Sequence, residues 1–331
     1  MMRNFSYTKV DSASSALTML GGSVNAKFLG GGTNLVDLMR ENIEQPDALL
    51  DVSAVRPLEI SQRPDGGLSI PAAMTNTAVA IDALVRQRYP VLSQAILFGA
   101  SGQIRNMATV GGNLMQRTRC HYFYDHAARC NKRGQGAGCD AIEGFNRMHA
   151  ILGTSEHCIA THPSDFCVAL AALNAIVRVE SRQGVRDIPF EAFHCLPGET
   201  PHVETTLRSD ELITSVELPP SSCAGHSQYR KVRDRASYAF ALVSVAAALE
   251  VENGIIREVR VALGGVAPKP WRARHAEQIL SGAPATAATF QQAADAELLQ
   301  AKGLGDNDFK VELARRMIVN LLTELAESRN K

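Results

Sequence analysis

Four cysteines lie in one polar, glycine-spotted stretch with the spacing C-x9-C-x8-C-x18-C: Cys120, Cys130, Cys139 and Cys158. Thiolates are ligands for zinc and for iron–sulfur clusters. Zinc fingers, zinc ribbons and ferredoxin-type clusters rely on short pairs such as C-x2-C, and this stretch contains no such pair. Four cysteines still suffice for a tetrahedral or a cubane site, so the spacing indicates a metal without choosing between zinc and iron.

The residues around these cysteines suit a metal site. Interleaved glycines allow the main chain to wrap closely around a cluster: Gly134, Gly136, Gly138 and Gly153. Nearby basic residues would offset the negative charge of thiolates: Arg117, Arg119, Arg129, Lys132 and Arg133. A histidine of the same stretch could replace a cysteine as ligand: His121, His126, His149 or His157. Among the other thiols, we expect Cys167 to be a buried small hydrophobe, and Cys195 and Cys223 show no partner pattern.

Two glycine-rich turns precede the cysteines: KFLGGGTNL at 27–35 and ASGQIRNMATVGGNL at 100–114. Glycine lets the backbone approach a phosphate, and free N–H groups at a helix start favour its negative charge. Neither turn has the Rossmann G-x-G-x-x-G spacing or a Walker A lysine. Steric need alone can also explain glycines between a strand and a helix. Together, however, the two turns could clamp a dinucleotide diphosphate from both sides, which places a nucleotide cofactor beside a metal site and indicates electron transfer.

The composition excludes several other classes of protein. A chain of 331 residues can form two domains or three small ones, and 34 basic residues balance 34 acidic ones, so no net field attracts nucleic acid. The sequence has no apolar run long enough to span a bilayer, and its start does not resemble a signal peptide. We therefore expect the chain to remain in the cytoplasm unless a partner carries an export signal. The seven cysteines lack the spacing of a small secreted disulfide framework, so we expect reduced thiols.

The hydrophobic patterns predict mixed helices and strands. The first fifty residues predict a strand, a helix capped by Asp11 or Ser12, a buried strand, and a helix opened by Thr33 or Asn34. Predicted hairpins surround 64–67 and span 175–190, two helices separated by Pro90 occupy 76–100, and a helix follows Ser164 or Asp165. The composition changes near 219–225, after which strands turn at 253–254 and the tail from Trp271 is mainly helical.

Several motifs together resemble one family over essentially the whole chain: KFLGGGTNL, IRNMATVGGNL, HPSD, YRKVRDRASYAFALVSVA and LGGVAPKPWRA. They are similar to the medium, FAD-binding subunit of the xanthine-dehydrogenase-family molybdenum hydroxylases. The stretches QRTRC, YFYD, CNKR and CIATHPSD resemble in particular the flavin subunit of heterotrimeric periplasmic aldehyde oxidoreductases. The resemblance implies an α+β chain: a two-lobed FAD-binding fold of the vanillyl-alcohol-oxidase (PCMH) type, with lobes at 1–55 and 56–222, and a C-terminal domain of the CO-dehydrogenase flavoprotein type at 223–331.

The resemblance also implies which residues hold FAD. The first turn would wrap the ribityl and diphosphate region: Lys27, Phe28, Leu29, Gly30, Gly31, Gly32, Thr33, Asn34 and Leu35. The other face of the diphosphate would meet Thr109, Gly112 and Asn113, and Ala100 and Ser101 join the cofactor set. Asp165 would meet the adenosine half, while Ile213 and Lys231 would lie near the isoalloxazine ring. By residue type alone, two alternatives to cofactor binding stay open: Asp165 as a helix cap and Lys231 as a solvated charge.

In such subunits, the insert at about 116–160 holds a [4Fe–4S] cluster, so the resemblance assigns the four cysteines as its ligands. It implies a large molybdenum-cofactor subunit that oxidises aldehydes, a small subunit with two [2Fe–2S] clusters, and electron transfer through FAD to an external acceptor such as ferredoxin. The complex would reach the periplasm under a partner's twin-arginine signal. A 4-hydroxybenzoyl-CoA-reductase type of subunit with reversed electron flow, and a zinc-stapled scaffold without flavin, stay open as alternatives.

Overall fold

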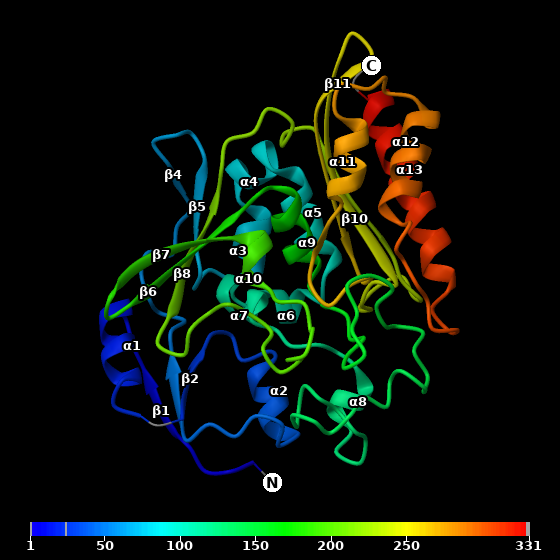
Figure 1. Ribbon diagram of the computed structural model, residues 1–331. Helices are drawn as coiled ribbons and strands as arrows, with labels where there is room; N and C mark the ends of the chain where they lie inside the picture. The colour runs from blue at the N-terminus through cyan, green and yellow to red at the C-terminus, as the bar shows by residue number, and fades with distance from the viewer. Residues whose placement is uncertain (1, 24, 329–331) are drawn as a thin grey trace.

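The computed structural model describes residues 2–23 and 25–328. Three separate sheets, each with its own helices, follow one another along the chain (Figure 1). They use residues 6–51, 61–218 and 227–272, and the boundaries predicted at 55/56 and 222/223 fall between them. The predicted α+β class is confirmed. Within the described residues, every helix is too short or too polar to cross a bilayer.

The first sheet is parallel, with the strand order β1-β3-β2. Parallel neighbours need crossover connections, and two helices supply them. The elements are β1 (Ser6–Lys9), α1 (Ala13–Leu20), β2 (Ala26–Leu29), α2 (Leu35–Arg40) and β3 (Ala48–Asp51). Ser12 caps α1 as predicted, because its side chain accepts a hydrogen bond from the Ser15 amide. The first glycine turn leaves the carboxyl end of β2 and leads into α2.

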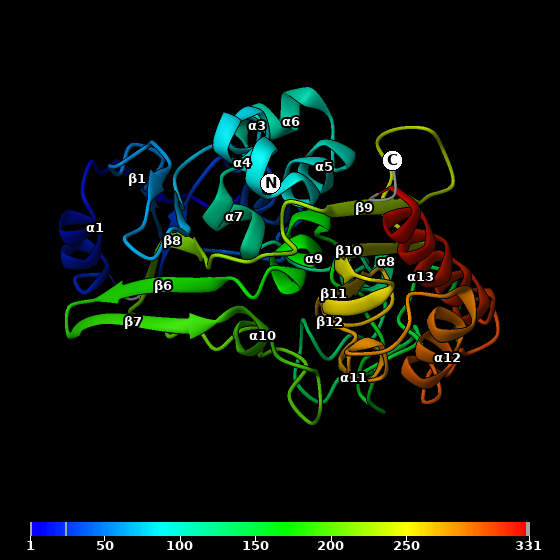
Figure 2. The same ribbon diagram turned by 90° about the horizontal axis from the view of Figure 1, so that it is seen from above.

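The second sheet is antiparallel, with the order β4-β5-β8-β6-β7. Its strands are β4 (Ser61–Gln62), β5 (Leu68–Pro71), β6 (Ile176–Ser181), β7 (Gly184–Pro189) and β8 (Leu212–Leu218). The two predicted hairpins are confirmed as β4–β5 and β6–β7. Figure 2 shows most of its helices gathered on one side of β6 and β7.

These helices are short, and side-chain caps explain their bounds. They are α3 (Asn76–Ile81), α4 (Ala83–Arg88), α5 (Pro90–Phe98), α6 (Gly102–Met107), α7 (Val110–Leu114), α9 (Asp165–Ala172) and α10 (Phe190–Phe193). The prediction of two helices over 76–100 is wrong, because Asp82 caps a further helix by accepting from the Val85 amide. The predicted break at Pro90 and the predicted cap by Ser164 are confirmed.

The third sheet has the order β12-β11-β10-β9 and is buried on both faces. Its elements are β9 (Ser227–Val232), β10 (Val243–Glu252), β11 (Ile255–Gly264), β12 (Trp271–Arg272), α11 (Arg274–Leu280), α12 (Ala287–Glu297) and α13 (Phe309–Ser328). Val245 and Ala247 face the core under α11–α13, whereas Ala246 packs with α9 in the core of the second unit. This double burial explains the nearly continuous apolar run of β10. The predicted turn at Asn253–Gly254 is confirmed, and both residues have positive φ.

The predicted insert at 116–160 is irregular apart from the single helical turn α8 (His121–Tyr124). Hydrogen bonds join it to the third unit. The amides of Ile151 and Leu152 both donate to the carbonyl of Val266. The fully buried ammonium of Lys310, on α13, donates to the carbonyls of His149 and Gly265. The insert is therefore a bridge between the second and third units.

The two glycine turns touch each other directly. A Cβ atom on Gly31 would lie 1.7 Å from the carbonyl oxygen of Met107, and one on Gly30 would lie 2.3 Å from the Thr109 hydroxyl. Both distances are shorter than any real contact of a Cβ atom allows. The steric explanation therefore holds for Gly30 and Gly31, because main chain packs on main chain at this point.

We expect Gly31→Ala to lower the free energy of unfolding by roughly 3 kcal/mol or more, because the added methyl group must separate the two turns. Urea unfolding followed by circular dichroism measures the change. Gly102→Ala is the matched control, since a Cβ atom there meets nothing within 4 Å. The control should change stability by less than about 1 kcal/mol. An unfolding midpoint of Gly31→Ala equal to that of the natural protein would contradict the packing argument.

Candidate cofactor-binding cleft and cysteine cage

A cavity of about 840 Å³ lies between the first and second sheets, and we call it the large cavity. Its volume is in the range of cofactor sites. Both glycine turns and strand β8 line it. The predicted cofactor residues in its wall are Lys27, Phe28, Leu29, Gly30, Gly31, Gly32, Thr33, Asn34, Leu35, Thr109, Gly112 and Ile213. The structure thus brings together parts of both turns that are about eighty residues apart in the sequence.

The first turn offers donors to an anion. Among the described residues, no hydrogen bond engages the backbone amides of Gly31, Gly32 and Thr33. The side chain of Asn34 accepts from the Arg117 amide at 2.9 Å, and its amide group faces the Tyr124 hydroxyl. Unpaired donors at a cavity wall fit a diphosphate, whose oxygens are strong acceptors. This observation supports FAD at the first turn.

A charged network forms another part of the wall. Arg117 donates to Glu204 at 2.6 Å and to Glu44 at 2.9 Å, and Lys132 donates to Glu204 at 2.6 Å. Lys27 pairs with Glu44. Burial raises the pKa of Glu204, but Lys132 and Arg117 outweigh that effect and hold it below its ordinary value. Three cations face two carboxylates, so the network leaves one positive charge in excess.

A second, small cavity of about 170 Å³ adjoins the large one. Both cavities are lined by Thr161, His162 and Pro163, so their walls are shared there. The small cavity is also lined by Cys120, His149, Asp165, Phe240 and residues of β10 and β11. The two cavities together provide an elongated site that runs from the first sheet toward the third.

Asp165 and Lys231 form a buried ion pair beside the small cavity. The Lys231 ammonium lies 2.7 Å from the Asp165 carboxylate, and the Tyr229 hydroxyl donates to the same carboxylate at 2.5 Å. The Lys231 side chain is 1% exposed, so its reading as a solvated charge is wrong. The prediction also places Asp165 at the adenosine half of FAD and Lys231 at the isoalloxazine ring. This separation is wrong, because two residues in contact cannot bind opposite ends of an extended cofactor.

The position of Ile213 supports this correction. Ile213 lines the large cavity together with the first turn, whereas Asp165 lines the small cavity. Ile213 and Lys231, predicted to share the ring, are therefore separated. A buried lysine needs a counter-charge, and Asp165 supplies it from a helix that is far away in the sequence.

Four predicted cofactor residues line neither cavity: Ala100, Ser101, Asn113 and Lys231, the last of which pairs with the lining residue Asp165. Ser101 caps α6 by accepting from the Ile104 amide. The side chain of Asn113 accepts from the Ser164 hydroxyl at 2.6 Å and so ties α7 to α9. The structure gives these residues structural roles, and their contact with a cofactor stays a prediction.

The four predicted metal-binding cysteines lie around one small space, which we call the cysteine cage: Cys120, Cys130, Cys139 and Cys158. In the described part of the chain, no three of their sulfur atoms lie within 4.8 Å of one another. A tetrahedral zinc site with Zn–S bonds of about 2.3 Å would bring the sulfurs to about 3.8 Å. The described thiols are therefore not gathered as closely as the ligands of a bound zinc ion.

Backbone amides surround the cage sulfurs. Cys120 is approached by the amides of Tyr122 and Phe123, Cys139 by three further amides, and Cys158 by that of Ala160 at 3.5 Å. Burial raises the pKa of Cys120 to about 12 and that of Cys158 to about 11. These thiols hold their protons at neutral pH unless a metal displaces them, and the N–H groups would then stabilise the thiolates.

His149 is also a neighbour of the cage, since its Nε2 atom lies 3.1 Å from the Cys120 sulfur. Burial lowers its pKa to about 4. The sequence analysis treats it only as one of several histidines, and it does not identify Glu44 and Glu204 at all. Isolated residues without a motif carry no signal in the sequence that would single them out.

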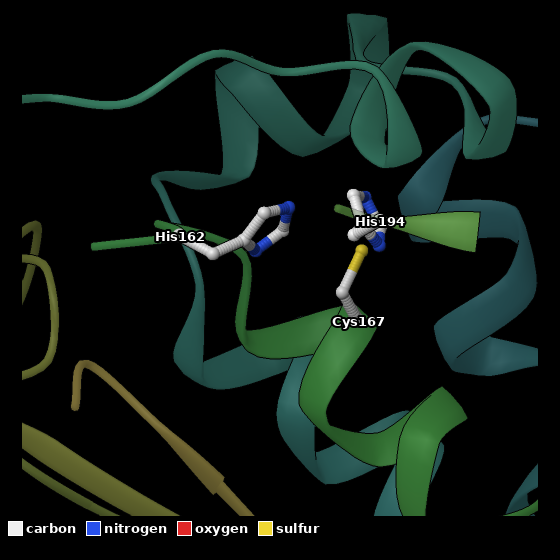
Figure 3. A group of neighbouring side chains, drawn as sticks. All are labelled: His162, Cys167 and His194. Carbon is white, nitrogen blue, oxygen red and sulfur yellow. The ribbon is translucent and has the colours of Figure 1, made fainter. Parts of the chain in front are cut away.

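A second cluster joins His162, Cys167 and His194 under the large cavity (Figure 3). Their potential ligand atoms lie within 4.8 Å of one another, and Cys167 is fully buried as predicted. Nδ1 of His162 accepts from the Ser164 amide, so its Nε2 carries the hydrogen and offers no lone pair. His194 donates from Nε2 to the Leu114 carbonyl. The group offers one imidazole lone pair instead of two and does not form a metal triad.

Comparisons with known proteins agree with this geometry. The family model described as FAD binding domain in molybdopterin dehydrogenase matches residues 3–221. The CO dehydrogenase flavoprotein C-terminal domain matches residues 212–325. The chain is 48% identical over 325 residues to the aldehyde oxidoreductase FAD-binding subunit PaoB of Escherichia coli, covering 98% of both chains. It is 27% identical to the glyceraldehyde dehydrogenase medium chain of Sulfolobus acidocaldarius, covering 84% of this chain and 81% of that one.

A solved structure shares the fold. The carbon monoxide dehydrogenase of Hydrogenophaga pseudoflava superposes with a TM-score of 0.76 at 24% identity and covers 99% of both chains. This likeness, with the two matching domains, confirms the predicted pairing of a two-lobed FAD-binding fold with a flavoprotein C-terminal domain. The chain belongs to the FAD-binding subunits of the molybdenum hydroxylase family of oxidoreductases.

Proposed function

We propose that this chain is the FAD- and [4Fe–4S]-binding electron-transfer subunit of a heterotrimeric molybdenum aldehyde oxidoreductase. The main support is that the large cavity, the small cavity and the cysteine cage share lining residues. Residues 161–163 line both cavities, and Cys120 lines both the small cavity and the cysteine cage. A cofactor in the cavities and a cluster in the cage would therefore be neighbours, as electron transfer between them requires.

The chain's own residues suggest how FAD would be held. The free amides of the first turn suit the diphosphate, and Ile213 offers an apolar surface to the adenosine half. Asp165 lines the small cavity, where the ring would lie, and Lys231 pairs with Asp165. When bound, the flavin supplies the ability to take up electrons singly and release them in pairs. A held lysine cation beside it would favour the anionic reduced form.

We favour an iron–sulfur cluster over zinc in the cage. Several backbone amides approach its sulfurs and could donate to a cluster. Cys120, Cys130, Cys139 and Cys158 would each supply one thiolate. Lys132, whose positive charge lowers the pKa of Cys158, would offset part of the negative charge.

The partners follow from the type of relative. The aldehyde oxidoreductase relative is by name one FAD-binding subunit of a larger enzyme. A large subunit with the molybdenum cofactor would convert aldehyde and water to carboxylate, three protons and two electrons. A small subunit with two [2Fe–2S] clusters would pass the electrons to this chain, which would release them to an external acceptor such as ferredoxin. A twin-arginine signal on a partner would carry the assembled complex to the periplasm.

We expect Cys130→Ser to lose most of the bound iron while it keeps FAD, since the cage and the first turn are separate sites. Iron analysis and flavin absorbance of the co-expressed complex measure both, with about four irons per chain expected in the natural protein. Cys223→Ser is the matched control, because Cys223 is a buried cysteine outside the cage. A colourless natural protein that contains zinc would instead support the scaffold alternative, and unchanged iron in Cys130→Ser would refute the ligand set.

We expect Gly112→Val to weaken FAD binding at least tenfold, about 1.4 kcal/mol, because the new side chain enters the wall of the large cavity. Titration of flavin-depleted protein with FAD, followed by fluorescence, measures the dissociation constant. Gly225→Val is the control, since a Cβ atom on Gly225 meets nothing within 4 Å and the residue lines neither cavity. Full retention of FAD affinity by Gly112→Val would argue against the second turn as part of the clamp.

A further inference from the structure

We propose that His149 is a positioning residue that donates a hydrogen bond to the Cys120 sulfur and thereby raises the reduction potential of the iron–sulfur centre in the cage. This inference rests on the proposed function, because it requires a cluster on the four cysteines. It goes beyond that function in assigning one side chain the control of the potential. The pair also forms the wall between the cage and the small cavity.

The contact itself is direct. The Nε2 atom of His149 lies 3.1 Å from the Cys120 sulfur, well inside the range of a hydrogen bond to sulfur. Both residues line the small cavity, and Cys120 also lines the cage. The backbone amides of Tyr122 and Phe123 also approach the Cys120 sulfur. His149 is therefore the side-chain donor at the cage corner that faces the small cavity.

The direction of the hydrogen bond follows from the chemistry of the partners. A metal-bound thiolate can only accept, so Nε2 of His149 must carry the hydrogen. The Asn146 carbonyl faces the ring, but Nδ1 makes no hydrogen bond of good geometry within the described residues. A bound thiolate at Cys120 would therefore fix the tautomer that carries the hydrogen on Nε2.

The backbone of His149 is held from two sides. Its amide donates to the Asn146 carbonyl at 2.9 Å, and its carbonyl accepts from Asn307 at 3.2 Å and from the Lys310 ammonium at 2.9 Å. Lys310 is fully buried, and its ammonium donates to backbone carbonyls and not to a carboxylate. Burying an ammonium without a carboxylate partner costs free energy of folding, and these hydrogen bonds fix the backbone of His149. The ring is thereby aimed at the cage.

A donor to the sulfur acts on the charge of the centre. The reduced cluster carries one more negative charge than the oxidised cluster, so an N–H group that points at a ligand sulfur stabilises the reduced form more. Removing the donor should make the potential more negative. The number of iron ligands stays the same, because the four thiolates are untouched.

The test is a redox titration of the assembled complex followed by electron paramagnetic resonance. His149→Leu should shift the equilibrium of the iron–sulfur centre toward the oxidised form about tenfold, which is about 59 mV for one electron. His149→Gln, which keeps an N–H donor, should recover part of the shift. His126→Leu is the matched control in the same insert, because His126 is exposed and pairs with the Glu41 carbonyl. Iron and flavin contents should remain unchanged in all three variants.

Two results would overturn the inference: an unchanged potential in His149→Leu, or a loss of iron equal to that of Cys130→Ser, which would make His149 a ligand. Should His149→Leu fail to fold, the natural complex labelled with 15N-histidine decides the matter. Hyperfine spectroscopy of the reduced centre should show an exchangeable proton and a weak nitrogen coupling. A strong nitrogen coupling would identify His149 as an iron ligand. The absence of any coupling would refute the hydrogen bond to Cys120. Absence of iron from the natural complex would instead refute the proposed function itself.

Discussion

The close contact of the two glycine turns is the constraint on which the cofactor cleft depends. The turn after β2 lies against the Met107 carbonyl and the Thr109 hydroxyl because Gly30 and Gly31 have no Cβ atoms. This contact brings the parallel sheet to the helices of the second unit and makes one wall of the large cavity from both. Because the turn packs through its bare Cα atoms, its amides remain free to serve as donors.

The rest of the cleft is built from pairs of opposite charge that come from separate units. Arg117, which lies in the insert of the second unit, meets Glu44 of the first unit. Lys231 on β9 meets Asp165 on α9 in the same way. Breaking such a buried pair leaves an uncompensated charge, so each pair specifies how its two units dock.

Local features were predictable from the sequence, and non-local pairings were not. The hairpins at 64–67 and 253–254 follow from turn residues whose preferences act over four positions. Family resemblance placed the glycine turns and the cysteines correctly around shared spaces. It divided Asp165 and Lys231 between opposite ends of the cofactor because no sequence pattern shows that residues 66 positions apart touch. The extra helix boundary at Asp82 was missed, since the apolar periodicity continues across the cap.

The anchoring of the insert by Lys310 has a consequence for biogenesis. Ribosomes release a chain from its amino end, so α13 emerges well after the insert. The carbonyl of His149 therefore has no Lys310 partner until a further 161 residues have been synthesised. The metal-binding corner reaches its final form only after α13 has been synthesised.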